Sequence, residues 1–221
     1  MLVRVNSHDS GQTVGGAPVR EEPVAVELMN TVWADRDGLH DALATTPDAT
    51  AWLNQVKDRL PHVRPSRGRV RARLTLSEAE QLRRLRDAIR RVAADVTDDP
   101  RTVEPHGGEI LTIDEALSVI NSAAELLPAR LLHRVDGDVV ADRSAVDPLR
   151  AAIAGFAMDA VPLLAGDHDR GPLRACLAPA CVLYFVQDHT LREWCSPACG
   201  NRARVARHYK RAQEAKRRSS T

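Results

Sequence analysis

Residues 176–199 read CLAPACVLYFVQDHTLREWCSPAC and contain all four cysteines of the chain. The cysteines form two close pairs with the spacing C-x4-C-x13-C-x3-C. Zinc prefers four soft ligands in a tetrahedron, and two close pairs joined by a connecting segment can supply them. We therefore predict one structural zinc ion, Zn²⁺, bound by Cys176, Cys181, Cys195 and Cys199. Redox-active or coincidental thiols are the alternative.

The residues between the cysteines predict how the two pairs meet. Residues 177–180 include a proline and predict a tight turn, and residues 182–186 are rich in strand formers that return the chain. Ser196 followed by Pro197 is typical of a helix N-cap and first helical position, so Cys199 falls in the opening turn. Because all four positions are cysteines, we expect a closed, structural site that contributes to folding.

A basic helix is expected after Cys199, where residues 200–218 read GNRARVARHYKRAQEAKRR. At about 100° per residue, four arginines of this helix fall within about 60° of one another: Arg204, Arg207, Arg211 and Arg218. Such a stripe can lie along a phosphate backbone or reach base edges in a major groove. The candidate nucleic-acid contacts are Arg202, Arg204, Arg207, Lys210 and Arg211. The alternative is a solvated cationic face. Three residues point away from the arginine stripe and could pack on the zinc module: Val205, Tyr209 and Ala212.

The composition supports a soluble protein with a charged end. Of 221 residues, 43% are hydrophobic and only 3% aromatic, so the core must be built from aliphatic residues, which favours helices. Residues 170–221 carry eleven Lys and Arg against three Asp and Glu, a net charge of +8, whereas residues 1–169 carry a net charge of −7. A basic module on an acidic body indicates a polyanionic partner for the module.

No membrane partner is expected, because no stretch approaches the roughly 20 apolar residues of a bilayer span. The first residues, MLVRVNSHDSGQTVGG, lack the apolar run of a signal peptide. We therefore expect a cytoplasmic protein, whose reduced thiols favour a metal over disulfides.

The fold class expected is mainly α: a multi-helix domain with a small β-hairpin, followed by a zinc module made of a short β-ribbon and a helix. The boundaries predicted are a disordered lead-in at residues 1–20, a helical domain at 21–167, the zinc module at 171–214 and a basic tail at 215–221. Loops are expected at residues 61–73 and 99–109, which are rich in Pro, Arg, Gly and His.

Helices of the large domain are predicted from apolar periodicity and start signals. They are expected at residues 23–33, at 47 or 48 to 60, from 77 to 96, from 112 to 127 and from about 146 to 164. Ser77 with Glu80 and Thr112 with Glu115 have the capping-box spacing. Pro162 is expected to bend or end the last of these helices. Asp136-Gly137 predicts a two-residue turn in a β-ribbon at residues 131–140.

Polar residues interrupt the apolar stripes of the large domain, and they have two interpretations. They could line a small-molecule pocket, or they could form a buried hydrogen-bond network that fixes helix packing. The residues concerned are Asn30, Thr31, Arg36 and Arg86. No Gly-rich phosphate loop, nucleophile elbow or acid–base pair is evident, so no catalytic activity is expected.

Several stretches resemble a known family. Residues 194–196 (WCS) and 199–202 (CGNR), with RARVARHY after them, resemble CGNR-type zinc-finger proteins. Residues 26–32 (VELMNTV) resemble the motif that opens the ABATE domain preceding this finger, and residues 82–88 also fit that domain. The resemblance covers residues 23–212 and implies that the four cysteines are zinc ligands. For the last two residues of the CGNR motif the resemblance leaves two roles open: bracing the zinc turn or contacting phosphate. We expect Asn201 to brace the zinc turn. For Arg202 the two roles are equal alternatives.

The family is described as stress-induced transcription regulators. The resemblance thus implies a DNA-binding regulator whose helical domain senses an effector or dimerises, with double-stranded DNA, a small-molecule effector and a second subunit as expected partners. A small-molecule-binding protein or enzyme with a purely structural finger is the alternative, and RNA is the alternative polyanion.

Overall fold

The computed structural model describes residues 13–14, 17–60, 73–101, 110–128, 131–142, 147–167 and 169–219. Its helices are α1 (Val24–Met29), α2 (Thr46–Val56), α3 (Leu76–Val96), α4 (Ile113–Ala124), α5 (Pro148–Ala165) and α6 (Pro197–Ser219), with a 3₁₀ turn, η1 (Lys57–Arg59). Its strands pair as four antiparallel ribbons: β1 (Thr13–Val14) with β2 (Ala17–Pro18), β3 (Val32–Ala34) with β4 (Leu39–Asp41), β5 (Leu131–Val135) with β6 (Asp138–Asp142), and β7 (Leu173–Ala175) with β8 (Tyr184–Val186). The mainly α fold with small hairpins is confirmed.

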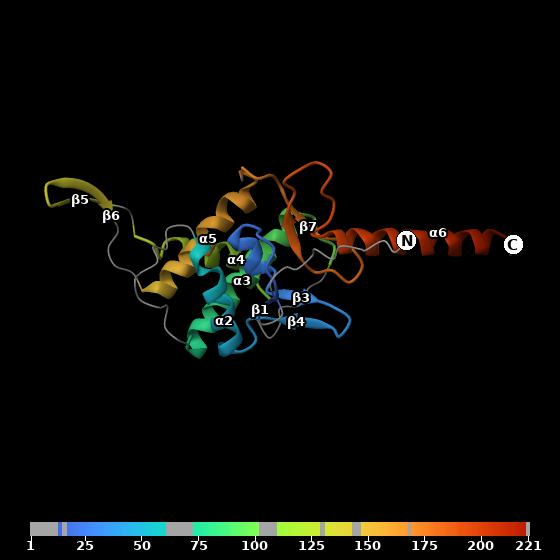
Figure 1. The fold of residues 1–221 in the computed structure, drawn as a ribbon, viewed down its shortest axis with the longest axis horizontal. Coiled ribbons are helices and arrows are strands. Elements are labelled where there is room, and N and C mark those ends of the chain that lie inside the picture. Colours follow the sequence, from blue (N-terminus) through green and yellow to red (C-terminus); the bar gives the residue numbers. More distant parts are fainter. Residues whose placement is uncertain are drawn as a thin grey trace, which may run out of the picture.

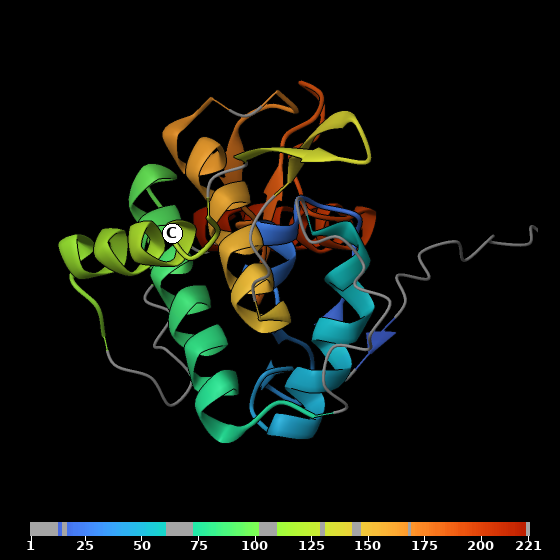
Figure 2. The ribbon, with the colours of Figure 1, turned by 90° about the vertical axis from the view of Figure 1, so that its left-hand side faces the viewer.

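The core lies where α1 to α5 pack together, as Figure 2 shows. α3 places a row of leucines, alanines and Ile89 against this core, and α5 contributes Ile153 and Phe156. The Phe156 ring stacks on Trp52 of α2, with ring centroids 5.6 Å apart. By length and composition alone α5 could cross a membrane, but 56% of it is buried inside the fold, which is typical of the core helix of a soluble domain.

The starts of α3 and α4 test the two predicted capping boxes. The box at Thr112 and Glu115 is confirmed. The box at Ser77 and Glu80 is wrong by two residues, because α3 begins at Leu76. Thr75 has extended backbone angles, its hydroxyl accepts the Glu78 N–H, and the Glu78 carboxylate accepts the Thr75 N–H at 2.6 Å. This earlier box caps the helix two residues sooner than the predicted one would.

The first predicted helix, residues 23–33, is only partly correct. α1 ends at Met29, and Val32 and Trp33 lie in β3 instead. Trp33 pairs with His40 across the ribbon, and their rings stack with centroids 5.1 Å apart. β-branched and aromatic residues suit a paired strand as well as a helix face. In the same way α2 gives way to η1 after Val56 rather than continuing to residue 60.

The Asp136-Gly137 hairpin is confirmed. Both turn residues have positive φ, 51° and 95°, as a type I′ turn requires. Residues 131–140 are exposed on both faces of the ribbon. In Figure 1 β5–β6 and α6 project from opposite ends of the longest axis.

The observed bounds of α5 and α6 differ from the predicted ones. Asp147 caps α5 by accepting the N–H groups of Leu149 and Arg150, so the helix starts at Pro148 rather than near residue 146. It runs through Pro162 without ending and stops before Gly166, which has a φ of 81°. α6 continues to Ser219, so the described part of the expected tail at 215–221 is helical.

Two loop predictions and the lead-in fall largely outside the described residues. Of the expected loops, residues 61–72 and 102–109 lie outside them, as do residues 1–12 and 15–16 of the lead-in. Within the lead-in, Ala17 is 1% exposed and belongs to the core, so the folded body reaches further toward the N-terminus than predicted.

Candidate metal centre and nucleic-acid surface

The four cysteines meet at one point between β7, β8 and the start of α6. All four are buried, and their sulfur atoms all lie within 4.8 Å of one another. The sulfur of Cys195 lies 3.8 Å from that of Cys181 and 3.4 Å from that of Cys199. A tetrahedron with zinc–sulfur bonds of about 2.3 Å places its sulfurs about 3.8 Å apart. The geometry therefore fits one zinc ion.

Backbone hydrogen bonds set the positions of these sulfurs. The Cys176 N–H donates to the Leu183 carbonyl, 2.9 Å, which closes the β7–β8 ribbon next to the site. The Cys181 N–H donates to the Ala178 carbonyl, 3.0 Å, in the predicted tight turn. The Cys199 N–H donates to the Ser196 hydroxyl, 3.2 Å, so Ser196 caps α6 as predicted.

The crowded thiols cannot all ionise without a cation. Hydrogen bonds from Cys176 and the other two thiols hold the pKa of Cys199 far below its usual range. Hydrogen bonding to Cys181 lowers the pKa of Cys176 to about 7, whereas hydrogen bonding to Cys176 raises the pKa of Cys195 well above its usual range. A divalent cation removes this conflict, because it attracts all four thiolates at once.

Of the two CGNR residues whose role was open, Arg202 is the one that braces the site. Its Nη2 donates to the Cys199 sulfur at 3.0 Å, which stabilises a thiolate there. Asn201 is exposed, and its side chain makes no hydrogen bond within the part of the chain that the structure describes. The expectation that Asn201 supplies the bracing is therefore wrong. Arg202 lies one turn away, close enough to reach back to the sulfur.

Buried polar contacts join the zinc module to the helical domain, and we call them the finger–body clamp. The Asn30 side chain both donates to the Tyr184 carbonyl and accepts the Tyr184 N–H, each at 2.9 Å. Arg90 of α3 donates to the carbonyls of Met29, 2.8 Å, and Val182, 3.2 Å. Asn30 thus acts as an added strand partner for β8.

Carboxylates and arginines complete the clamp on both sides of β8. Buried Glu22 accepts the Val186 N–H, 3.1 Å, and pairs with Arg192. Arg101, paired with Asp99, donates to the carbonyls of Cys176 and Cys181, 2.9 and 2.6 Å.

Tyr184 links the clamp to the core. Its hydroxyl donates to Asp99 at 2.8 Å, and its ring lies under the Arg90 and Arg101 guanidinium groups. Burial, aided by the Asp99 hydrogen bond, raises the pKa of Tyr184 to about 12. Because Tyr184 also belongs to the main hydrophobic core, the two domains share one interior.

Three of the four candidate pocket residues lie in a buried network. Asn30, Thr31 and Arg86 are at most 1% exposed. Arg86 forms ion pairs with Asp41 and Asp87, and its Nη1 also lies 3.5 Å from the Thr31 hydroxyl. The fourth residue, Arg36, is exposed on the β3–β4 turn and does not join them. The arrangement favours the hydrogen-bond network over a ligand pocket.

Apart from Asn30, the clamp residues were not found from the sequence. A partial signal exists in α3, where Arg90 follows Arg86 by one turn on the apolar face, since a charge inside such a stripe is seldom buried unless paired. Asp99 and Arg101 follow the helix with no such pattern. Their partners lie about 80 residues further along the chain, beyond the reach of local spacing.

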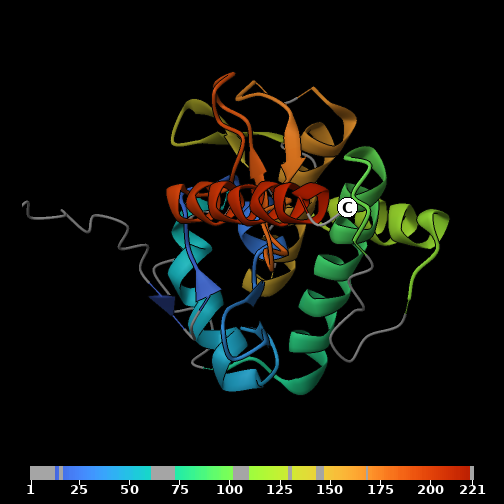
Figure 3. The same ribbon diagram turned by 90° about the vertical axis from the view of Figure 1, so that its right-hand side faces the viewer.

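α6 presents its arginines to solvent. Residues 204–218 are all exposed, and Figure 3, which faces this end of the molecule, shows α6 in front of the other elements. At about 100° per residue Arg204, Arg207 and Arg211 share the face of Gly200, and Lys210 lies beside it. The expected packing of Val205 and Tyr209 is wrong, because they are 46% and 64% exposed.

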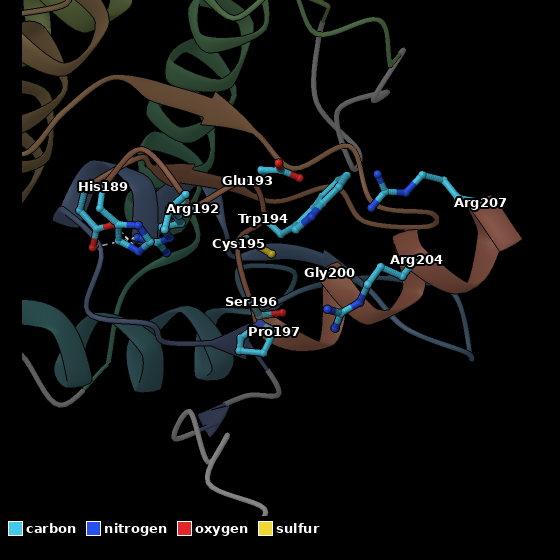
Figure 4. Close-up of a pocket in the computed structure, with 12 residues that line it drawn as sticks. His189, Arg192, Glu193, Trp194, Cys195, Ser196, Pro197, Gly200, Arg204 and Arg207 are labelled. Carbon is cyan, nitrogen blue, oxygen red and sulfur yellow. Dashed lines mark ion pairs between the residues drawn. The ribbon is translucent and has the colours of Figure 1, made fainter.

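An open hollow of about 600 Å³ lies beside the first three turns of α6. Figure 4 shows Trp194 within it, with Arg204 and Arg207 extending from α6 on the same side. The hollow is lined by Asp188, His189, Leu191, Arg192, Glu193, Trp194, Cys195, Ser196, Pro197, Gly200, Arg204 and Arg207. The zinc site therefore supports one wall of the hollow and the start of the arginine stripe together.

Comparison with known families gives two matches that follow one another along the chain. Residues 22–167 match ABATE, described as "Putative stress-induced transcription regulator", and residues 173–212 match the CGNR zinc finger. No curated protein matches the chain. The zinc-finger match and the clustered cysteines indicate one structural zinc ion. Since the first match alone covers more than half of the residues, the chain belongs to the ABATE family and carries a CGNR zinc finger behind the ABATE domain.

Proposed function

We propose that this protein is a cytoplasmic, DNA-binding transcription regulator that contacts double-stranded DNA through α6. The observation that carries the proposal is the exposed stripe of Arg204, Arg207 and Arg211 on a helix whose first turn contains a zinc ligand. Along residues 200–219 eight Lys and Arg face a single acidic residue, Glu214. Such a helix suits a polyanion far better than it suits a protein core.

The dimensions of α6 also suit duplex DNA. Its 23 residues span roughly 35 Å at about 1.5 Å per residue. A helix fits the major groove, and arginines on one face can contact phosphates or pair with guanine edges. The phosphate contacts would supply affinity and a strong dependence on salt.

The zinc site and the clamp give α6 a fixed direction. Cys199 lies in the first turn, Arg202 holds its sulfur, and the inner strand β8 is bonded to the body. A contact helix that is held at its root loses less conformational freedom on binding than a free one. The ABATE domain therefore serves as the platform from which the arginines project.

The test is duplex binding by zinc-loaded protein across a salt series, followed by fluorescence anisotropy. Replacing Arg204, Arg207 and Arg211 by Ala should weaken binding and lower the slope of log affinity against log salt by about 3. The matched control removes three exposed arginines from the body, Arg84, Arg134 and Arg150, and should leave the slope unchanged. Wild-type protein that fails to bind duplex DNA even at low salt would refute the proposal.

The alternative of a small-molecule-binding protein or enzyme finds little support in this arrangement. Asn30 is engaged with Tyr184, and Arg86 pairs with two carboxylates, so of these two side chains only the buried Nη2 of Arg86 is left without a hydrogen-bond partner among the described residues.

A further inference from the structure

We propose that the hollow beside Trp194 binds a single unpaired base of the nucleic acid whose backbone lies on α6. This inference rests on the proposed function and names the structural feature of DNA that the finger prefers. It predicts that the protein favours duplexes with an everted or bulged nucleotide over fully paired ones.

Trp194 supplies a stacking surface at the root of α6. A Cβ atom on Gly200 would lie only 3.0 Å from Cδ1 of Trp194, so the indole packs directly on the helix backbone at this glycine. The rest of the side chain is partly exposed and lines the hollow. An indole held against the helix in this way can accept a base of any identity, because every base has a π-face. A base inside an intact duplex stack cannot present that face.

The charges around the hollow favour a base over a bare phosphate. Arg204 and Arg207 line the side formed by α6, but Asp188 and exposed Glu193 line the loop side. Arg192 also lines the hollow and pairs with Asp188 at 3.5 Å. A phosphate deep in the hollow would meet these carboxylates, whereas a base can donate an exocyclic amino group or a ring N–H to Glu193.

The hollow opens onto the arginine stripe. Gly200, Arg204, Arg207 and Arg211 follow one another on the same face of α6. A nucleotide whose base lies against Trp194 would therefore have its flanking phosphates beside Arg204 and Arg207. One continuous surface thus offers a stacking site and backbone contacts, the combination found where proteins bind unstacked nucleotides.

The experiment compares two short duplexes of identical sequence, one fully paired and one with a single bulged nucleotide at its centre. We expect full-length zinc-loaded protein to bind the bulged duplex about 10-fold more tightly, as one base–aromatic stack would give. Trp194→Ala should remove this preference while leaving affinity for the paired duplex nearly unchanged. Trp194→Phe should keep most of it.

Tyr209→Ala is the matched control, because Tyr209 is an exposed aromatic residue of α6 on the face away from the hollow. It should keep the full preference. Zinc content is measured for each variant, so that a damaged finger is recognised. If Trp194→Ala loses zinc, the comparison rests on wild type and Trp194→Phe.

Three results separate this inference from the proposed function. Equal binding of both duplexes by wild type overturns the base site and leaves DNA binding by α6 intact. A preference that persists in zinc-loaded Trp194→Ala also overturns it. Failure to bind either duplex at low salt overturns both proposals.

Discussion

The inner half of the zinc module, residues 173–199, and its outer half, α6 from residue 200 onward, differ in how their arginines are used. Arg90 and Arg101 from the body donate to carbonyls of the inner half, and Arg192 of the inner half pairs with the buried carboxylate of Glu22 in the body. Arg204, Arg207 and Arg211 of the outer half are exposed. Buried arginines fix the inner half to the body, whereas the exposed arginines of α6 remain available to bind a partner. Burial therefore decides which of the two roles an arginine has.

This difference predicts which substitutions change the free energy of unfolding and which change binding. Changes to the inner half should lower the free energy of unfolding, because its contacts are buried and shared with the body. Changes to the exposed residues of the outer half, from Arg204 onward, should alter binding and leave the free energy of unfolding nearly unchanged.

The largest effect is expected from loss of the metal. Cys195→Ser should abolish stoichiometric zinc binding and lower the free energy of unfolding by more than about 5 kcal/mol, because zinc-binding energy is folding energy in such modules. Elemental analysis and urea denaturation followed by circular dichroism would measure both. Addition of a chelator to wild type should reproduce the loss, and an unchanged denaturation curve would contradict the role given to zinc.

A smaller effect is expected from the clamp, and two asparagines provide the comparison. Asn30→Ala leaves the buried N–H and carbonyl of Tyr184 without partners, which should cost about 2–4 kcal/mol. Asn201→Ala, on exposed α6, should change stability by less than about 0.5 kcal/mol. If chemical denaturation shows equal losses of unfolding free energy for the two variants, the distinction between buried and exposed contacts is contradicted.

Tyr184→Phe should have a smaller effect at neutral pH, about 1 kcal/mol, because it removes one hydrogen bond to Asp99. Its pH dependence is more informative. The pKa of Tyr184 rises from an ordinary 10 to about 12 in the folded protein. The folded state then keeps a proton that the unfolded state loses, so this contribution is complete below pH 10 and is lost as the pH rises toward 12.

This loss amounts to about 2–3 kcal/mol in wild type, at 1.36 kcal/mol per pKa unit. Urea denaturation at a series of alkaline pH values should show the decline in wild type. A decline of the same size in Tyr184→Phe would assign it to other groups.

The smallest effect on stability is expected from Arg211→Ala, within about 0.5 kcal/mol, because the side chain is exposed. The same change should lower the salt slope of duplex binding by about 1. Thermal denaturation and anisotropy on the same preparation measure the two quantities. Destabilisation without a change in slope would reverse the roles assigned to the two halves.

Features that depend on neighbours a few residues apart were predictable. The spacing of the cysteines, the Ser196 cap, the Thr112–Glu115 box and the Asp136-Gly137 turn are all local, and the structure has each of them. Where two local signals competed, prediction failed. Thr75 and Ser77 both had capping-box spacing, and Val32 and Trp33 suited a strand as well as a helix.

The sequence by itself determined the zinc site and the arginine stripe, because ligand spacing and helical periodicity are properties of short segments. Only the tertiary structure decided that Asn30 binds the backbone of β8, since its partner Tyr184 lies 154 residues away. The hollow at Trp194 also required the fold. It forms where a loop packs against Gly200 of a helix, and no spacing along the chain specifies that contact.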